Sequence, residues 1–368
     1  MKLHIFNPEH DLALAANQSN YTAPHAGRQL RNDLSFIPAL WADEGDFVLV
    51  DDIDCAYDKV RHLGAIYNKV EFITKLQLRE VFKDTFLVDS VHPWGWDRAL
   101  VSELAHLGCP DIMLPTPSTL DAIRQLSSRR WAAEHVQRDV VYVEHEDELR
   151  RVIAAKGKAV VKAPWSSSGR GVRYVASSAD SDAMAGTLAK GGNDFEACMK
   201  WASNIIKSQG GVTVEPYYNK VKDFGMEFEV KDGQVVYHGL SIFETIKGAY
   251  TGNILAPEQE KEEMLAAYVE HEELESIRRM IVERMQPALH GVYSGPFGVD
   301  MMVCSDADKN LFVNPCVEVN LRRTMGHVAL SLGLSDKTSR HIMQVDYDGN
   351  RYHLRVLPGK PSEEAPFH

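Results

Sequence analysis

The feature of this sequence that most constrains its fold is a change of pattern along the chain. In the first third, short apolar runs alternate with segments of helical periodicity, which is typical of an α/β layer built on a parallel sheet. We expect strands at 2–6, 46–50, 69–73 and 84–88, and helices at 26–42, 54–67 and 96–107. Ligands of such sheets bind where the strands end, so the loop 7–11 after the first strand is expected at a cleft.

The remainder of the chain has the pattern of an α+β fold with antiparallel sheets. We expect helices at 117–127, 129–137 and 146–155, and strands at 140–143, 158–164 and 171–175. Further apolar runs flank 231–234, which contains Asp232 and Gly233, and 305–310; an Asp-Gly pair between such runs indicates a hairpin. We therefore expect three parts, 1–115, 116–213 and 214–368, the first α/β and the others α+β.

Composition excludes several classes of protein. Among 368 residues, 40 Lys and Arg face 52 Asp and Glu, and this net charge of −12 disfavours binding to nucleic acid or to an anionic membrane. Five cysteines without CxxC spacing indicate neither a disulfide framework nor a zinc site, and 15 histidines without HExxH spacing add no zinc motif. The N-terminus does not resemble a signal peptide and no 18-residue apolar run occurs, so we expect a cytoplasmic protein.

A loop rich in serine and glycine lies between two expected strands. It contains Ser166, Ser167, Ser168, Gly169 and Gly171. Small residues let backbone N–H groups approach phosphate oxygens, and Lys162 at the end of the preceding strand could meet the same phosphates. Taken alone, the pattern is equally that of an ordinary hairpin loop beside a solvated lysine.

Near the C-terminus, one strand face carries hard-oxygen side chains. Glu318 and Asn320 alternate with valines, so they share a face, and Asp300 lies on the partner strand of the expected hairpin. If Gly298 lies opposite Glu318, Asp300 is a diagonal neighbour on that face. Such oxygens suit Mg²⁺, and Arg322 continues the row toward a phosphate. The alternative is the solvated outer face of a sheet.

The two features together, in this order, resemble those of the ATP-grasp enzymes over roughly 116–330. The resemblance implies a Rossmann-like N-terminal domain over 1–115, followed by a small ATP-grasp subdomain over 116–213. A large subdomain that bears the metal-binding strands would then cover 214–368. The family usually has an earlier cation at the start of the small subdomain; the candidates are Arg129 and Arg130, and the sequence does not choose between them.

The resemblance also implies the roles of individual residues. The segment 160–172 resembles the nucleotide lysine, Lys162, and the glycine-rich flap, and 214–218 resembles the hinge that reads adenine, with Glu215, Pro216 and Tyr217. Glu227 would bind the ribose hydroxyls. The metal ligands would be Asp300, Glu318 and Asn320, and Arg322 would contact phosphate; Lys162 and Arg322 are the expected catalytic residues.

The implied activity is that of a ligase dependent on ATP and Mg²⁺, with Mn²⁺ as an alternative ion. A carboxylate would be activated as an acyl phosphate and attacked by an amine or other nucleophile, with release of ADP and phosphate. A kinase-like phosphotransferase and a non-catalytic ATP-binding protein are the alternatives, and a homodimer is left open. The family often places an arginine shortly before the metal aspartate, where this chain has Gly298 and Val299, which disfavours a D-alanine–D-alanine-type ligase.

On the substrate side, the sequence offers candidates without choosing among them. Asn7, Glu9, His10 and Asp11 follow the first strand, and Arg28 and Arg31 lie on the next helix; they form either a polar substrate cleft or an ordinary loop and surface helix. The segment 92–97, with two tryptophans, is typical of a rigid buried corner. The loop 241–253, with Lys247 and Tyr250, either closes over substrate or simply connects a hairpin.

Overall fold

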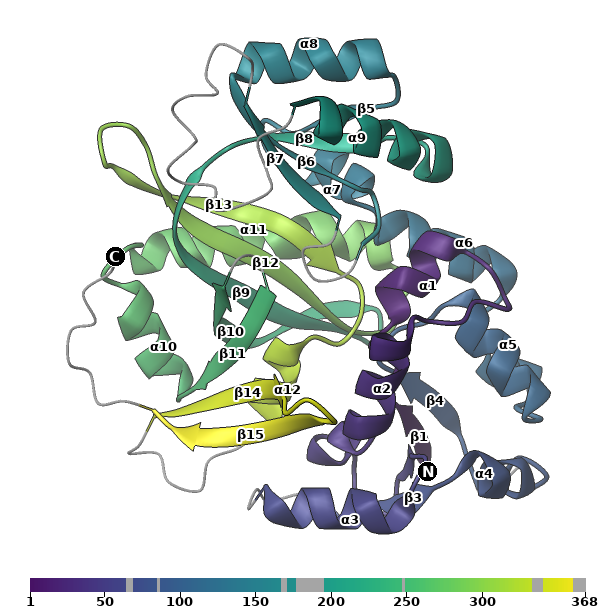
Figure 1. Cartoon of the computed structure of the whole chain (residues 1–368). Helices are drawn as coiled ribbons and strands as arrows, with labels where there is room; N and C mark the ends of the chain where they lie inside the picture. The colour runs from purple at the N-terminus through teal and green to yellow at the C-terminus, as the bar shows by residue number, and fades with distance from the viewer. Residues whose placement is uncertain are drawn as a thin grey trace.

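The computed structural model describes residues 1–63, 69–84, 87–166, 171–176, 195–246, 249–332 and 340–359. Figure 1 shows three sheets arranged along the chain: an N-terminal sheet in purple and blue, a small teal sheet, and a long sheet that runs from green to yellow. Ser167, Ser168, Gly169 and Lys247 lie outside the described residues.

The N-terminal sheet is parallel, as the alternating pattern predicts. Its strands, in the order β3-β2-β1-β4, pair in parallel throughout. The elements of this part are β1 (Lys2–Ile5), α1 (His10–Ala16), α2 (His25–Leu34), η1 (Ile37–Leu40), β2 (Phe47–Leu49), α3 (Ile53–His62), β3 (Glu71–Ile73), α4 (Lys75–Val81), β4 (Ser90–Pro93), α5 (Arg98–His106) and η2 (Asp111–Met113).

Two expectations for this part are wrong. The fourth strand is β4 rather than 84–88, because the chain at 82–84 turns after α4 and Ser90 is the residue that pairs with Lys2. The expected loop 7–11 is partly helical, since α1 begins at His10. Asn17 ends α1 in a left-handed conformation that asparagine tolerates.

The small subdomain contains a four-stranded antiparallel sheet in the order β5-β8-β6-β7. Helices α8 and α9 pack on it through a core that includes Leu149, Ile153, Cys198 and Met199. Its elements are α6 (Pro117–Leu126), α7 (Arg129–His135), β5 (Val141–Val143), α8 (Glu146–Lys156), β6 (Lys158–Lys162), β7 (Val172–Ala176), α9 (Phe195–Gln209) and β8 (Val212–Pro216). The boundary predicted at 213/214 therefore falls inside β8; the change of sheet comes after Pro216.

The large sheet has seven strands in the order β13-β12-β9-β10-β11-β14-β15, and its successive pairings are antiparallel. Its apolar face packs on α11, where Ile277, Ile281 and Met285 meet Phe224 and Phe297. The elements are β9 (Asn219–Lys231), β10 (Gln234–Ile246), β11 (Ala249–Leu255), α10 (Glu258–Leu265), α11 (His271–Leu289), β12 (Gly295–Ser305), β13 (Leu311–Asn320), α12 (Met325–Ser331), β14 (His341–Tyr347) and β15 (Tyr352–Pro358).

Both predicted hairpins are present. Asp232 and Gly233 have φ of 51° and 73° between β9 and β10, as a tight Asp-Gly turn requires. The second hairpin joins β12 to β13, but its register differs from the expected one. Asp300 lies directly opposite Glu318, and Gly298 lies opposite Asn320.

A shared apolar core joins the N-terminal domain to the far end of the large sheet. Phe6, Leu34 and Ile37 belong to one buried cluster with Val328 of α12 and Met343 of β14. Figure 1 shows β14 and β15, in yellow, beside α2. These two parts of the chain therefore present a common, fixed surface to the small subdomain.

None of the helices in the described ranges combines the length and apolarity that crossing a bilayer requires.

Candidate active site

The polar face of β12 and β13 brings Asp300, Glu318 and Asn320 together. Asn320 Nδ2 donates to Asp300 Oδ2 at 3.0 Å, and Asp300 and Glu318 are cross-strand partners. Burial, followed by the negative charges of Glu318 and Glu227, raises the pKa of Asp300 to about 7. Two carboxylates are thus held close together on one face of the sheet.

These oxygens fit a Mg²⁺ ion by their chemistry. Mg²⁺ is bound in proteins by one or two carboxylates and completes its octahedron with water and substrate phosphates. Among the described residues, no cluster of three or more His, Cys, Asp and Glu side chains could hold a metal. Asp300 and Glu318, with the amide of Asn320, would hold such an ion and leave positions for water and phosphate oxygens.

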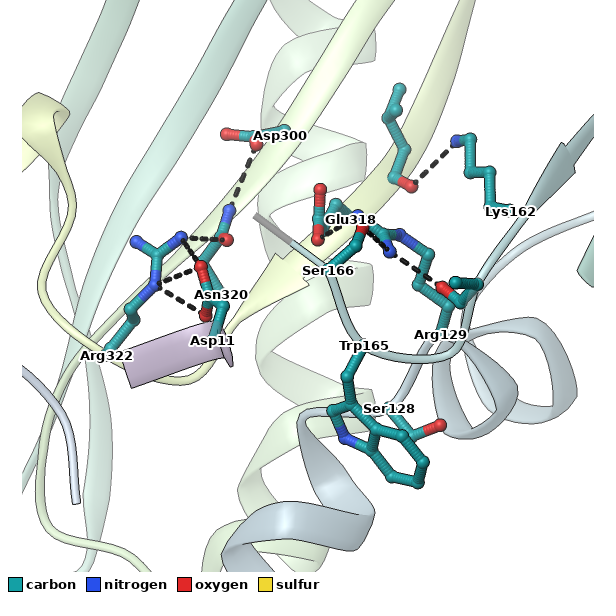
Figure 2. Close-up of polar contacts among 12 residues, drawn as sticks. Asp11, Ser128, Arg129, Lys162, Trp165, Ser166, Asp300, Glu318, Asn320 and Arg322 are labelled. Atoms are coloured by element: carbon teal, nitrogen blue, oxygen red, sulfur yellow. Dashed lines mark hydrogen bonds and ion pairs between the residues drawn. The ribbon is translucent and has the colours of Figure 1, made fainter. Parts of the chain in front are cut away.

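Arg322 extends the same row but is already paired. Its Nη2 and Nε donate to Asp11 at 2.7 and 2.9 Å, and Nη2 also donates to Asn320 Oδ1 at 3.0 Å (Figure 2). Burial alone would raise the pKa of Asp11, but the charge of Arg322 and its hydrogen bonds lower it. This pair joins α1 of the N-terminal domain to the end of β13, and sequence reasoning did not foresee it.

On the opposite side, the small subdomain supplies buried cations. Lys162, 7% exposed, forms an ion pair with Glu215 at 2.6 Å, and its Nζ lies 3.5 Å from the carbonyl oxygen of Val317 on β13. Lys162 and Glu215 come from adjacent strands of one sheet, β6 and β8. The lysine and the predicted hinge residue therefore lie together at the boundary between the two subdomains.

Arg129 bridges the two sides. Its Nη1 donates to the carbonyl of Ala163 at 2.7 Å and to Ser166 Oγ at 2.8 Å, while its Nη2 lies 2.6 Å from Glu318 Oε1 (Figure 2). Arg130 points elsewhere: it pairs with Glu134 and Glu144 and stacks on Tyr142. Of the two arginines that the sequence left open, Arg129 is the one that faces the site.

The two ends of the Ser/Gly loop are in close contact. A Cβ on Gly171 would lie 2.2 Å from the Cβ of Ser166, so this approach requires glycine. Trp165, just before the loop, donates its indole N–H to the carbonyl of Arg124 at 2.9 Å and stacks on that guanidinium. The start of the loop is therefore anchored to α6.

The predicted hinge carries an aromatic pair. Pro216 ends β8, and the ring of Tyr217 lies 6.1 Å from that of Tyr174 on β7, edge to face. Tyr174 is 38% exposed. The position of Tyr174 opposite the hinge was not predicted from the sequence. The pattern that could have indicated it is an aromatic residue shortly after the glycine-rich loop.

Glu227 lies within β9 and is buried, with 3% of its surface exposed. Its Oε2 accepts a hydrogen bond from Thr324 Oγ1 at 2.8 Å and lies 3.0 Å from His327 Nδ1. Its negative charge also acts on Asp300. The contact of Glu227 with the ribose hydroxyls stays a prediction.

A pocket lies at the junction of the three parts. It is lined by His10 and Asp11 of α1, by 164–166 of the small subdomain, and by Glu318 and Asn320 of β13. The loop after the first strand, expected at a cleft, thus contributes to this pocket through His10 and Asp11. Arg28, by contrast, is absent from its lining, and Arg31 pairs with Glu9 and Glu103 on the other side of α1.

Comparison with known proteins was informative only at the level of structure. No protein-family model and no curated protein matches the sequence. The biotin carboxylase domain of 2-oxoglutarate carboxylase from Hydrogenobacter thermophilus, solved with MgADP and bicarbonate, superposes with a TM-score of 0.51 at 12% identity. The match covers 94% of this chain and 74% of that one. The chain has the ATP-grasp fold.

Two further solved structures are similar over most of their length. N5-carboxyaminoimidazole synthetase from Staphylococcus aureus, in complex with ADP, is 13% identical, with a TM-score of 0.48 and coverage of 97% of this chain and 91% of that one. L-amino acid ligase from Bacillus licheniformis is 14% identical, with a TM-score of 0.45 and coverage of 94% and 79%.

Proposed function

We propose that this ATP-grasp chain is a Mg²⁺-dependent ligase that uses ATP to activate a small carboxylate as an acyl phosphate. An amine or other nucleophile would then displace phosphate, so the products would be the ligated compound, ADP and phosphate. The observation that carries the proposal is the contact between the predicted phosphate-binding side and the predicted metal side. Arg129 Nη2 and Glu318 Oε1 are 2.6 Å apart although 189 residues separate them in sequence.

Each side of the pocket has a role in this proposal. Lys162, Arg129 and Ser166 would hold the nucleotide phosphates, since their donors lie at the subdomain boundary. Asp300, Glu318 and Asn320 would hold Mg²⁺, which would supply positive charge to the terminal phosphates. The hinge at 215–217, with Tyr174 opposite Tyr217, would take the base.

The transferring phosphoryl group would be stabilised mainly by position and electrostatics. Arg322 is held by Asp11 and Asn320 beside the proposed metal face, where its positive charge would attract a phosphate or a substrate carboxylate. An acyl phosphate hydrolyses if it is exposed, so the site would have to exclude water while this intermediate exists. Assembly as a homodimer stays a prediction.

The experiment that tests this function is a screen of small carboxylic acids paired with amines, with MgATP, in which both nucleotide products are resolved. We expect ADP and phosphate to accumulate only when the correct acid is present. Release of AMP and pyrophosphate would mean adenylation and would overturn the mechanism. A phosphorylated acid that accumulates and does not react with any amine would favour a kinase.

A further inference from the structure

A buried histidine lines the pocket, and the proposed function gives it no role. His10, the first residue of α1, is 1% exposed and borders the pocket with Asp11, Glu318 and Asn320. It comes from the segment 7–11, and its partners come from the tryptophan-containing segment 92–97. The structure thus joins two sequence motifs whose purpose the sequence did not reveal.

The histidine ring is held in place by a hydrogen-bonded network. Its Nδ1 lies 3.4 Å from Asp97 Oδ2, and the same oxygen accepts from Asn7 Nδ2 at 3.2 Å. The other oxygen of Asp97 accepts from the backbone N–H of Leu100 at 2.9 Å and so caps α5. Asn7 is fixed in turn, because its amide donates to the carbonyl of Gly95 at 2.8 Å and accepts from the N–H of that residue.

Gly95 is required for this arrangement. A Cβ at this position would lie 2.6–2.7 Å from three atoms of the His10 ring. The ring therefore rests directly on the backbone of the turn that follows β4. This close contact leaves the imidazole ring of His10 little freedom to rotate.

The network determines which nitrogen of His10 carries the proton. Asp97 accepts hydrogen bonds from Leu100 and Asn7, and an ionised carboxylate can only accept. Nδ1 of His10 is then the donor toward Asp97, and Nε2 is the ring nitrogen that is available to accept a proton. An aspartate that fixes the tautomer of a histidine in this way prepares Nε2 to act as a base.

Nε2 is buried and has no hydrogen-bond partner within the described parts of the chain. A buried polar atom without a partner costs free energy, so its retention in a pocket calls for a ligand. The polar groups around this pocket are those that we assign to phosphate, metal and substrate. A substrate atom that carries a proton is therefore the partner that this position fits.

We propose that His10 is the base that removes a proton from the attacking nucleophile, and that Asp97 is its positioning residue. This inference rests on the proposed ligase function and narrows the nucleophile to one that must lose a proton, such as a primary amine. The N–C bond forms as the C–O bond to phosphate breaks, and phosphate leaves with that electron pair. The N–H proton passes to Nε2 and is then returned to a phosphate oxygen, so charge and atoms balance.

The test separates formation of the acyl phosphate from its capture. A panel of amino acids, dicarboxylates and hydroxy acids is incubated with the full chain, MgATP and hydroxylamine, whose nitrogen lone pair is free at neutral pH. The acid that yields most hydroxamate is then assayed with ammonium as the nucleophile. His10→Gln keeps a polar side chain but cannot relay a proton.

We expect His10→Gln to lower ammonium ligation by about 100-fold or more, while hydroxamate formation changes by less than about threefold, as for loss of a general base. Asp97→Asn retains a helix-capping side chain and should show the same selective loss. The matched control is His4→Gln: His4 is 5% exposed, its Nε2 lies 3.0 Å from Asp46, and it does not line the pocket. This variant should leave both reactions unchanged.

Each other outcome contradicts a particular claim. If His10→Gln keeps full ammonium ligation, or loses hydroxamate formation to the same extent, His10 is a packing residue and the inference is wrong. If the wild type forms no hydroxamate with any acid, the proposed function fails and the inference fails with it. Melting curves with MgATP identify any variant that has lost its fold, and His10→Asn, with a smaller side chain, then replaces His10→Gln.

Discussion

At the residue scale, the clearest sign of function is a carboxyl group in an unfavourable place. Asp300 is flanked by Glu318 and Glu227, and together with burial they raise its pKa to about 7. A sheet that needed only stability would carry an amide or an apolar residue there, because a charge buried without a partner is costly. The cost is understandable if a cation binds, since proteins often retain destabilising groups at functional sites.

This leads to a prediction about pH and stability in the absence of metal. The native state binds a proton at Asp300 up to about pH 7, whereas the unfolded chain releases it near pH 4, so stability should fall as pH rises between these values. Asp300→Asn should remove this loss and raise the free energy of unfolding by about 1–3 kcal/mol at pH 8, with no gain at pH 3.5. Denaturant titrations of wild type and variant in EDTA, at both pH values, measure this difference in the free energy of unfolding.

The control for that prediction is Asp308→Asn, in the exposed loop of the same hairpin. It should have no effect at either pH. If Asp300→Asn instead destabilises the protein at pH 8, Asp300 is satisfied in the metal-free state. The inference that a cation binds beside Asp300 would then be wrong.

The adjacent arginines Arg129 and Arg130 give a second residue-scale prediction. Arg129→Gln should weaken MgATP binding by about 10–100-fold, because a charge-assisted hydrogen bond contributes about 1.5–3 kcal/mol. Arg130→Gln should bind MgATP as the wild type does, since Arg130 pairs with Glu134 away from the pocket. Calorimetric titration of both variants decides the matter, and equal affinities would remove Arg129 from the nucleotide site.

At the scale of elements, the site depends on how α1 meets the end of β13. Asp11 and Arg322 are 311 residues apart in sequence, and their side chains are 21% and 17% exposed. Removal of one member of such a pair leaves an uncompensated charge, which is more costly than the pair itself is stabilising. The link therefore fixes both the orientation of Arg322 and the position of the helix that carries His10.

We expect Asp11→Asn to lower the free energy of unfolding by about 2–4 kcal/mol. The comparison is Asp346→Asn, which breaks a surface pair with Arg355 whose side chains are 40% and 52% exposed. That change should cost at most about 1 kcal/mol. Chemical denaturation of the two variants measures the difference, and similar costs would mean that α1 is held by apolar packing alone.

The register of β12 and β13 shows what the sequence could and could not predict. Alternation correctly placed Asp300, Glu318 and Asn320 on one face. Near the hairpin loop, Met302 pairs with Asn314 and Cys304 with Phe312, and this register, if continued, would put Gly298 opposite Glu318 as expected. A bulge intervenes: β13 has Pro315, Cys316 and Val317 where β12 has only Met301. Proline cannot donate to the ladder, but the sequence alone does not tell how the strand accommodates it.

Local sequence patterns predicted most of the helices and strands. They could not predict contacts between segments that are distant in sequence. The parallel sheet, the hairpins and the shared face of Asp300, Glu318 and Asn320 followed from periodicity and turn residues. The strand 84–88 was misplaced, because an apolar run at the end of a helix resembles a strand. The contacts of Arg129 with Glu318 and of His10 with Asp97 each join segments that only the tertiary fold brings together.

At the scale of the whole molecule, the arrangement of cores accounts for the position of the site. One apolar cluster joins the N-terminal domain to the large sheet, and α6 and α7 pack on the large sheet, whereas β5–β8, α8 and α9 share a core of their own. Polar contacts such as that of Arg129 with Glu318 cross the boundary between them. A nucleotide that binds at this boundary would contact the large sheet on one side and the sheet β5–β8 on the other.

The most direct test of the central claim is the fate of oxygen from the substrate carboxylate. With the acid that gives the fastest ADP release, labelled with ¹⁸O in its carboxylate, the released phosphate is analysed by mass spectrometry after ligation. Attack of the carboxylate on the γ-phosphorus predicts one ¹⁸O in phosphate and one oxygen lost from the product. Phosphate free of label, with both ¹⁸O atoms kept in the product, would contradict an acyl phosphate and with it the function proposed for this chain.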